Sequence, residues 1–231
     1  MSADRQQLIA QQRFLEHQQE LAKLDLSKRF DYIFQNNLWG SDESRSGPGS
    51  TMIETRTLRE DIVALLRGVD ATSMLDIPCG DFHWLSQVDL GVTYTGADIV
   101  PAIVESNQQK YTTPNRQFLR LDATTSPLPQ VDLIFCRDCL VHLSFADIRK
   151  ALARIQAGRI TYLMTTTFPT EPANVDIATG DWRPLNFERA PFGFPPPIEA
   201  VLEACTEHDG IFADKSMGLW RVANLPAIAA P

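Results

Sequence analysis

Long hydrophobic runs are missing from this chain, and so is an excess of basic residues. No apolar stretch approaches the roughly 20 residues that a membrane-spanning helix needs, and the first residues lack a signal peptide's apolar core. With 21 basic and 29 acidic residues, the formal net charge is −8. Such a balance disfavours binding to nucleic-acid backbones, which requires a basic face. We therefore expect a cytoplasmic protein with no nucleic-acid or membrane partner.

Cysteine is scarce, and no internal repeat is visible. Four cysteines among 231 residues favour reduced thiols over a disulfide framework. The composition is otherwise that of an ordinary globular protein, with 44% hydrophobic and 22% charged residues. A chain of this length can bury a substantial core within a single compact unit.

Glycine is also sparse in the turn around which the chain is organised. Residues 74–77 predict a short buried strand, which ends at Pro78 and Gly80. Asp81, a residue type favoured at helix N-caps, predicts that a helix restarts there. A strand, a tight glycine turn and a helix N-terminus form the first half of a nucleotide-binding βαβ unit.

Acidic residues follow successive predicted strands. The strand 93–98 ends in Asp98, about 20 residues after Asp76, a spacing that suits recognition of a ribose diol. Asp122 follows the next predicted strand, over 117–121. Ligands of open α/β sheets bind at the carboxyl ends of the strands, so these carboxylates are expected to line one site.

The fourth predicted strand, 131–136, completes a resemblance. The motifs Leu75–Gly80, Gly96–Asp98, Leu121–Ala123 and Asp132–Cys136 resemble, in order and spacing, those of class I S-adenosylmethionine (SAM) dependent methyltransferases. The resemblance covers roughly residues 60 to 168. It implies an α/β, Rossmann-like class I methyltransferase fold, with a mostly parallel seven-stranded sheet, helices on both faces, and SAM as cofactor.

The sequence departs from the family at the turn, where the usual Gly-x-Gly-x-Gly is reduced to one glycine, Gly80. This disfavours a dinucleotide, whose pyrophosphate needs close backbone approach at several glycines. An NAD-dependent oxidoreductase and a SAM-binding subunit without activity nevertheless stay open as alternatives.

The resemblance implies the cofactor-binding residues. Asp98 would accept hydrogen bonds from both ribose hydroxyls, and Asp122 from the adenine amino group. Asp76 and Gly80 would shape the floor beneath the methionine part. The full set expected to bind SAM is Asp76, Pro78, Cys79, Gly80, Asp81, Trp84, Asp98, Ile99, Asp122, Ala123, Cys136 and Arg137. Alternatively, Asp98 caps a helix from Val100, and Asp122 is an ordinary turn residue.

Methyl transfer requires a positioned acceptor and, for a hydroxyl or an amine, removal of a proton. His142, just past the fourth strand, suits a general base, and Asp138 could orient it or act itself. Arg137, with Arg45 or Arg183, could clamp an acceptor carboxylate or phosphate. Ordinary alternatives are a loop hydrogen bond for His142 and an ion pair between Arg137 and Asp138.

Two irregular segments are expected to complete the acceptor site. Residues 39–50 form a Gly/Ser/Pro loop that is either a lid or an ordinary linker. Residues 169–197 contain seven prolines, which exclude a regular element, and a long structureless stretch is usually functional. We expect acceptor contacts from Trp39, Arg45, Ser46, Arg183 and Phe192.

The remaining segments complete the expected organisation. Helices over residues 3–23 and from Asp25 or Ser27 predict an N-terminal cap, so that residues 1–50 form the cap and lid loop and residues 51–231 the SAM-binding core. Segments 198–204 and 217–222 are expected to pair and close the sheet.

The function predicted from these features is SAM-dependent methylation of a small polar metabolite by a monomer or homodimer. Oxygen is the favoured acceptor atom, in a hydroxyl or in a phosphate or carboxylate held by arginine. The alternative is N-methylation of a small amine. No metal is expected, although Cys136, Cys139 and His142 form a pattern in which zinc is conceivable.

Overall fold

The computed structural model of the protein describes residues 9–228. Its α-helices are α1 (Ile9–Leu21), α2 (Leu26–Gln35), α3 (Arg56–Gly68), α4 (Pro101–Tyr111) and α5 (Phe145–Ala157). Its strands are β1 (Ser73–Asp76), β2 (Thr93–Asp98), β3 (Arg116–Arg120), β4 (Leu133–Cys136), β5 (Tyr162–Thr167), β6 (Glu199–Leu202) and β7 (Ser216–Arg221). None of the helices found between residues 9 and 228 is both long and apolar enough to cross a membrane.

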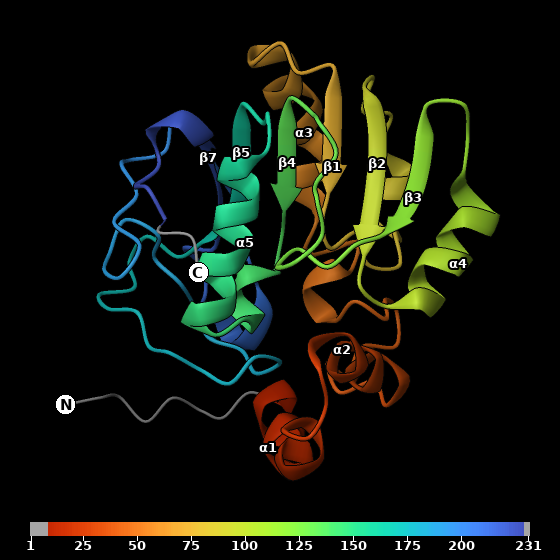
Figure 1. Ribbon diagram of the computed structural model, residues 1–231, viewed down its shortest axis with the longest axis vertical. Coiled ribbons are helices and arrows are strands. Elements are labelled where there is room, and N and C mark those ends of the chain that lie inside the picture. The colour runs from red at the N-terminus through yellow and green to blue at the C-terminus, as the bar shows by residue number, and fades with distance from the viewer. Residues whose placement is uncertain (1–8, 229–231) are drawn as a thin grey trace.

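The seven strands form one sheet in the order β3-β2-β1-β4-β5-β7-β6 (Figure 1). Strand β7 runs antiparallel to β5 and β6, and the other neighbours pair in parallel. The predicted mostly parallel seven-stranded sheet is therefore confirmed, as is the antiparallel pairing of segments 198–204 and 217–222.

Side chains of the central strands alternate between two cores, one on each face of the sheet. In β4, Leu133 and Phe135 pack with buried residues of α3 and α4, whereas Ile134 and Cys136 pack with those of α5. Such alternation is the period-2 geometry of a strand buried on both faces. Helices therefore cover both faces, as the resemblance implied (Figure 1).

An N-terminal helical cap lies beside the carboxyl ends of the strands (Figure 1). Helix α2 begins after Asp25, whose side chain accepts a hydrogen bond from the backbone N–H of Lys28. Ile33 of α2 packs with Phe14 and Leu21 of α1 in a small cluster of its own. The first predicted helix is observed from residue 9, and its expected residues 3–8 lie outside the described part of the chain.

The helix predicted to restart at Asp81 is absent, so that expectation is wrong. The chain after β1 forms turns and a single short 3₁₀ segment, η2 (Leu85–Gln87). Phe82 has φ +56°, a left-handed conformation that cannot continue a right-handed helix. The Asp81 carboxylate instead accepts hydrogen bonds from the Ser44 hydroxyl and the Arg45 backbone, both at 2.9 Å. Asp81 thus anchors the loop 39–50 to the turn.

Candidate active site

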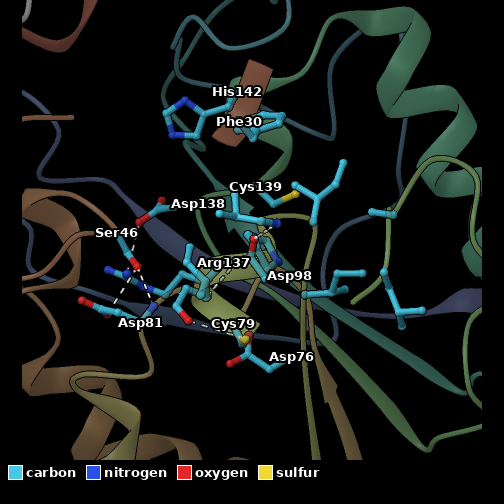
Figure 2. Close-up of a pocket in the computed structure, with 18 of the residues that line it drawn as sticks. Phe30, Ser46, Asp76, Cys79, Asp81, Asp98, Arg137, Asp138, Cys139 and His142 are labelled. Carbon is cyan, nitrogen blue, oxygen red and sulfur yellow. Dashed lines mark hydrogen bonds and ion pairs between the residues drawn. The ribbon is translucent and has the colours of Figure 1, made fainter. Parts of the chain in front are cut away.

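The carboxyl ends of the parallel strands surround a cavity with about 1030 Å³ of empty space, here called the strand-tip cavity. Most residues predicted to bind the cofactor line it, and Figure 2 shows several of them around its floor. These lining residues are Asp76, Pro78, Cys79, Gly80, Asp81, Trp84, Asp98, Ile99, Asp122, Ala123 and Arg137. Cys136 is the exception, because its side chain is buried in the α5-facing core.

Asp98, at the end of β2, joins the turn to the start of α4. Its Oδ2 accepts a hydrogen bond from the Gly80 N–H at 3.1 Å, and its Oδ1 accepts one from the Val100 N–H at 2.9 Å. Burial raises the pKa of Asp98 to about 6. Each carboxylate oxygen has two lone pairs, so both oxygens keep the capacity to accept a further hydrogen bond.

Asp76, at the end of β1, is a buried carboxyl group with no direct cationic partner among residues 9–228. The Tyr94 hydroxyl donates to its Oδ2 at 2.6 Å. Burial raises the pKa of Asp76 to about 8, since desolvation penalises its charged form. A positively charged ligand group next to this carboxyl would favour ionisation and be bound in return.

Asp122 follows β3 in an Asx-type turn. Its Oδ1 accepts hydrogen bonds from the N–H and the hydroxyl of Thr124, at 2.7 and 2.6 Å. Its other carboxylate oxygen has no partner within residues 9–228, so it can accept one from a ligand. The turn role and a binding role are therefore compatible.

The cap helix α2 contributes Leu26 and Phe30 to the strand-tip cavity, and sequence reasoning missed both. In Figure 2, Phe30 lies beside His142, at the opposite end of the cavity from Asp76. The amphipathic pattern of α2 indicated a buried face. The sequence left open that the N-terminal helices cover the active site, but it singled out neither residue as a ligand contact.

The single glycine of the turn makes room for the loop 39–50. A Cβ atom on Gly80 would overlap the hydroxyl oxygen of Ser46. That oxygen accepts a hydrogen bond from the Asp81 N–H at 2.9 Å. Gly80 is therefore required by close packing between the turn and this loop, and Ser46 occupies space beside the turn.

A second cavity, with about 1120 Å³ of empty space, adjoins the first. Four of its lining residues are aromatic, so it is here called the aromatic cavity: Trp39, Phe168, Trp182 and Phe212. The two cavities share Trp39, Ser46, Asp138 and His142, so a molecule in one can touch a molecule in the other at this junction.

His142 stands at the junction as a neutral base. Its Nδ1 lies 2.9 Å from the Asp181 carbonyl oxygen, which can only accept, so Nδ1 carries the hydrogen. Nε2 then holds a free lone pair and has no partner within residues 9–228. Burial lowers the pKa of His142 to about 4, which keeps the ring neutral near pH 7.

Asp138, also at the junction, is held as a carboxylate. Burial by itself would raise the pKa of Asp138, but the neighbouring cations Lys215 and Arg137 lower it overall. Lys215 Nζ lies 2.7 Å from Asp138 Oδ2, and the Arg137 guanidinium lies 3.1 Å from it. The ion pair with Arg137 that the sequence left open as an alternative is therefore present.

Arg137 lines the strand-tip cavity, but its guanidinium binds groups of the protein itself. It is 6% exposed, and its NH2 group donates to Glu203 at 2.5 Å and to the Gly49 carbonyl at 2.8 Å. These contacts hold the edge strand region and the loop 39–50 against the strand tips. They leave little capacity to clamp an anionic acceptor.

Three residues expected at the acceptor lie outside both cavities, which corrects their placement. Arg183 donates to the carbonyls of Leu140 and Leu143, at 2.9 and 2.6 Å, which fixes the loop that carries His142. Arg45 donates outward to the Phe34 carbonyl at 3.0 Å. Phe192 is buried in the α5-facing core. In each case the side chain satisfies a local packing or hydrogen-bonding need that the sequence did not reveal.

The sequence also missed most of the aromatic cavity. Besides the aromatic rings, it is lined by Cys205, Glu207, His208 and Lys215, from the segment between β6 and β7. No motif marks these positions, because they come together only through tertiary packing.

Comparisons with known proteins agree with this geometry. Residues 74–158 match a family model described as a methyltransferase domain. No curated protein sequence matches the chain.

Among solved structures, human N-acetylserotonin methyltransferase in complex with SAM superposes with a TM-score of 0.56 at 13% identity. The match covers 90% of this chain and 66% of that chain, just under two thirds of its length. Magnesium protoporphyrin IX methyltransferase from Synechocystis PCC 6803 with bound SAM gives a TM-score of 0.48 at 16% identity, over 66% of this chain and 81% of that chain.

At such identities the structural likeness concerns the fold. The family match concerns the segment that carries the strand-tip carboxylates. Residues 74–158 thus match a methyltransferase domain, and the sheet order with this superposition shows that the chain has the class I SAM-dependent methyltransferase fold.

Proposed function

We propose that the protein transfers a methyl group from SAM to a hydroxyl oxygen of a small molecule. The observation that carries the proposal is the junction of the two cavities, where Trp39, Ser46, Asp138 and His142 line both. A cofactor in the strand-tip cavity and an acceptor in the aromatic cavity would meet there, beside a neutral histidine.

The donor set of the strand-tip cavity fits SAM. Asp98 and the free oxygen of Asp122 are hydrogen-bond acceptors that suit the ribose hydroxyls and the adenine amino group. The uncompensated carboxyl of Asp76 suits the positively charged methionine part. When bound, SAM supplies a methyl group on a positively charged sulfur, which leaves as a neutral thioether.

His142 is the proposed general base. Its Nε2 lone pair would take the proton of the acceptor hydroxyl, while Nδ1–H stays bonded to the Asp181 carbonyl. The Asp138 carboxylate favours the resulting imidazolium, because its negative charge raises the affinity of His142 for a proton. Lys215 and Arg137 keep Asp138 in its charged form.

An anionic acceptor fits less well than a hydroxyl. Arg137 and Arg183 donate to protein groups, and Arg45 lines neither cavity and donates to the Phe34 carbonyl. Lys215 is the remaining cation that lines the aromatic cavity among residues 9–228, and it pairs with Asp138. A carboxylate or phosphate acceptor would therefore find its charge unmatched.

The test measures release of S-adenosylhomocysteine with a panel of phenols, aliphatic alcohols and amines. Replacing the base, His142→Gln, is expected to lower kcat by about 10²–10⁴-fold and to leave the Kd for SAM unchanged. His17→Gln is the matched control, because His17 bonds Tyr32 and lines neither cavity. Because the pKa of His142 is about 4, the wild-type rate should hold down to about pH 5.

Three outcomes would contradict the proposal. Unchanged turnover in His142→Gln would show that His142 is not the general base. Preferential methylation of amines would show that the acceptor atom is nitrogen and not oxygen. Absence of any calorimetric heat with both SAM and S-adenosylhomocysteine would reject the cofactor itself.

A further inference from the structure

We infer that the acceptor is a hydroxylated aromatic compound, bound with its ring in the aromatic cavity and its hydroxyl at His142. This inference rests on the proposed function, since it names the class of acceptor that the same site would methylate. It is drawn from the lining of the aromatic cavity and from the way its charges are paired.

The wall of the cavity away from the junction is a cluster of three rings. Phe168 and Trp182 lie 5.9 Å apart between centroids, Phe168 and Phe212 5.8 Å, and Trp182 and Phe212 4.8 Å. Their planes meet at 66° to 89°, which is edge-to-face packing. Such a cluster offers both ring edges and ring faces, and those surfaces complement another aromatic ring.

The position of these rings sets the orientation of an acceptor. Phe168, Trp182 and Phe212 line the aromatic cavity and not the strand-tip cavity, whereas Trp39 and His142 line both. The Trp39 ring lies 5.7 Å from the His142 ring between centroids, so it forms an aromatic wall beside the base. An apolar ring therefore binds away from the cofactor, with its polar substituent at the junction.

The wall is prearranged by hydrogen bonds of the proline-rich segment. The Trp182 carbonyl accepts from the Gln11 side chain at 3.0 Å, and the Arg183 N–H donates to the Val141 carbonyl at 3.2 Å. These bonds tie Trp182 to the N-terminal cap and to the turn that carries His142. A pre-formed wall reduces the conformational entropy lost when a flat ligand binds.

The polar end of the cavity suits a neutral hydrogen-bond donor. Three charged side chains lie close to Gly49. A Cβ atom built on Gly49 would be 3.2 Å from Asp138 Oδ2, 3.3 Å from Lys215 Nζ and 3.4 Å from Glu207 Oε2. Lys215 is already matched by Asp138 at 2.7 Å and lies 3.8 Å from Glu203. The junction offers His142 Nε2 and the Asp138 carboxylate as acceptors, and a hydroxyl group can donate to either.

The experiment compares 2-naphthol with its saturated counterpart, decahydro-2-naphthol, on the full chain saturated with S-adenosylhomocysteine. Saturation-transfer difference NMR titrations give the two affinities, and mass spectrometry with SAM detects 2-methoxynaphthalene. We expect 2-naphthol to bind at least about 10-fold more tightly and to be methylated. Phe212→Leu should weaken its binding by about 2–10-fold, the size of one aromatic pair contact.

Phe145→Leu is the matched control, since Phe145 is also half-buried and edge-to-face with an aromatic ring, Phe192, but lines neither cavity. Equal binding of the two naphthols, no binding of either, or equal effects of Phe212→Leu and Phe145→Leu would overturn the inference. Those results leave the cofactor site untouched. A lack of heat with S-adenosylhomocysteine would instead overturn the proposed function.

Discussion

The two cavities of this protein differ in how far apart their residues lie in the sequence. Most of the strand-tip cavity comes from residues 76–143, where each strand is followed by a polar turn. The aromatic cavity gathers residues from segments 39–49, 138–142, 168–182 and 205–215. A site built from consecutive strand tips follows from the fold itself, whereas a site built from distant loops can change while the fold stays the same.

The cavities also differ in their electrostatics, as two buried carboxyl groups show. Burial raises the pKa of Asp76, whose direct partner is the Tyr94 hydroxyl. Asp138 is also buried, yet Lys215 and Arg137 lower its pKa overall. The strand-tip cavity thus offers an uncompensated carboxyl to a cationic ligand. In the aromatic cavity, the Asp138 carboxylate is instead paired with Lys215 and Arg137.

The largest loss of stability is expected from breaking the ion pair between Arg137 and Glu203, on which both cavities depend. Arg137→Met would leave Glu203 buried without its guanidinium partner and lower the free energy of unfolding by about 3–5 kcal/mol. Urea denaturation followed by circular dichroism measures this change.

The double variant Arg137→Met/Glu203→Met is the control, because it removes both charges together. It should recover most of the loss, since two apolar side chains replace the pair. A loss below about 1 kcal/mol in the single variant would mean that the ion pair does not hold the two cavities together.

The next largest effect is on SAM affinity, and it should distinguish the strand-tip cavity from the aromatic cavity. Asp98→Asn is expected to weaken SAM binding by about 10–100-fold, because hydrogen bonds to a charged group contribute about 1.5–3 kcal/mol. Phe212→Leu, in the aromatic cavity, should leave SAM binding unchanged. Isothermal titration calorimetry distinguishes the two, and Asp89→Asn, an exposed loop position, is the control. Equal affinities in Asp98→Asn and Asp89→Asn would break the assignment of the strand-tip cavity.

The smallest changes in stability should have opposite signs for substitutions of Asp76 and Asp138. Because the folded protein holds the proton of Asp76 up to about pH 8, while an unfolded Asp releases it near pH 4, wild-type stability should fall as pH rises between these values. Asp76→Asn removes that term and should stabilise the free protein by about 1 kcal/mol or more at pH 8, with no such gain below pH 4.

Asp138→Asn should act in the opposite direction, lowering stability by about 1 kcal/mol or more at pH 7, because Lys215 and Arg137 lose a charged partner. This contribution is present above the ordinary Asp pKa and disappears only in strong acid. Thermal melts of both variants across pH 4–8 measure the contrast. Shifts of the same sign would show that the two carboxyls share one environment.

Local sequence patterns located most of the strands and both N-terminal helices, and the resemblance to class I methyltransferases implied how the sheet is built. Ser144, a residue type favoured at helix N-caps, caps α5, and its hydroxyl accepts a hydrogen bond from the Asp147 N–H. The leucines and isoleucine at helical spacing in α3 are buried: Leu58, Ile62, Leu65 and Leu66. The prediction failed at Asp81, where a residue type suited to a helix N-cap binds a loop almost 40 positions away in the chain. Helix propensity depends on neighbouring residues, so it does not predict such a contact.

Sequence alone determined where most strands lie, which carboxylates follow them and that the turn has a single glycine, because each of these features depends on a few neighbouring residues. Tertiary structure alone decided which arginines are already bound, which nitrogen of His142 is free and which rings face the second cavity. These features depend on contacts between segments separated by tens to hundreds of residues. Packing of the whole chain selects such contacts, and no local pattern encodes them.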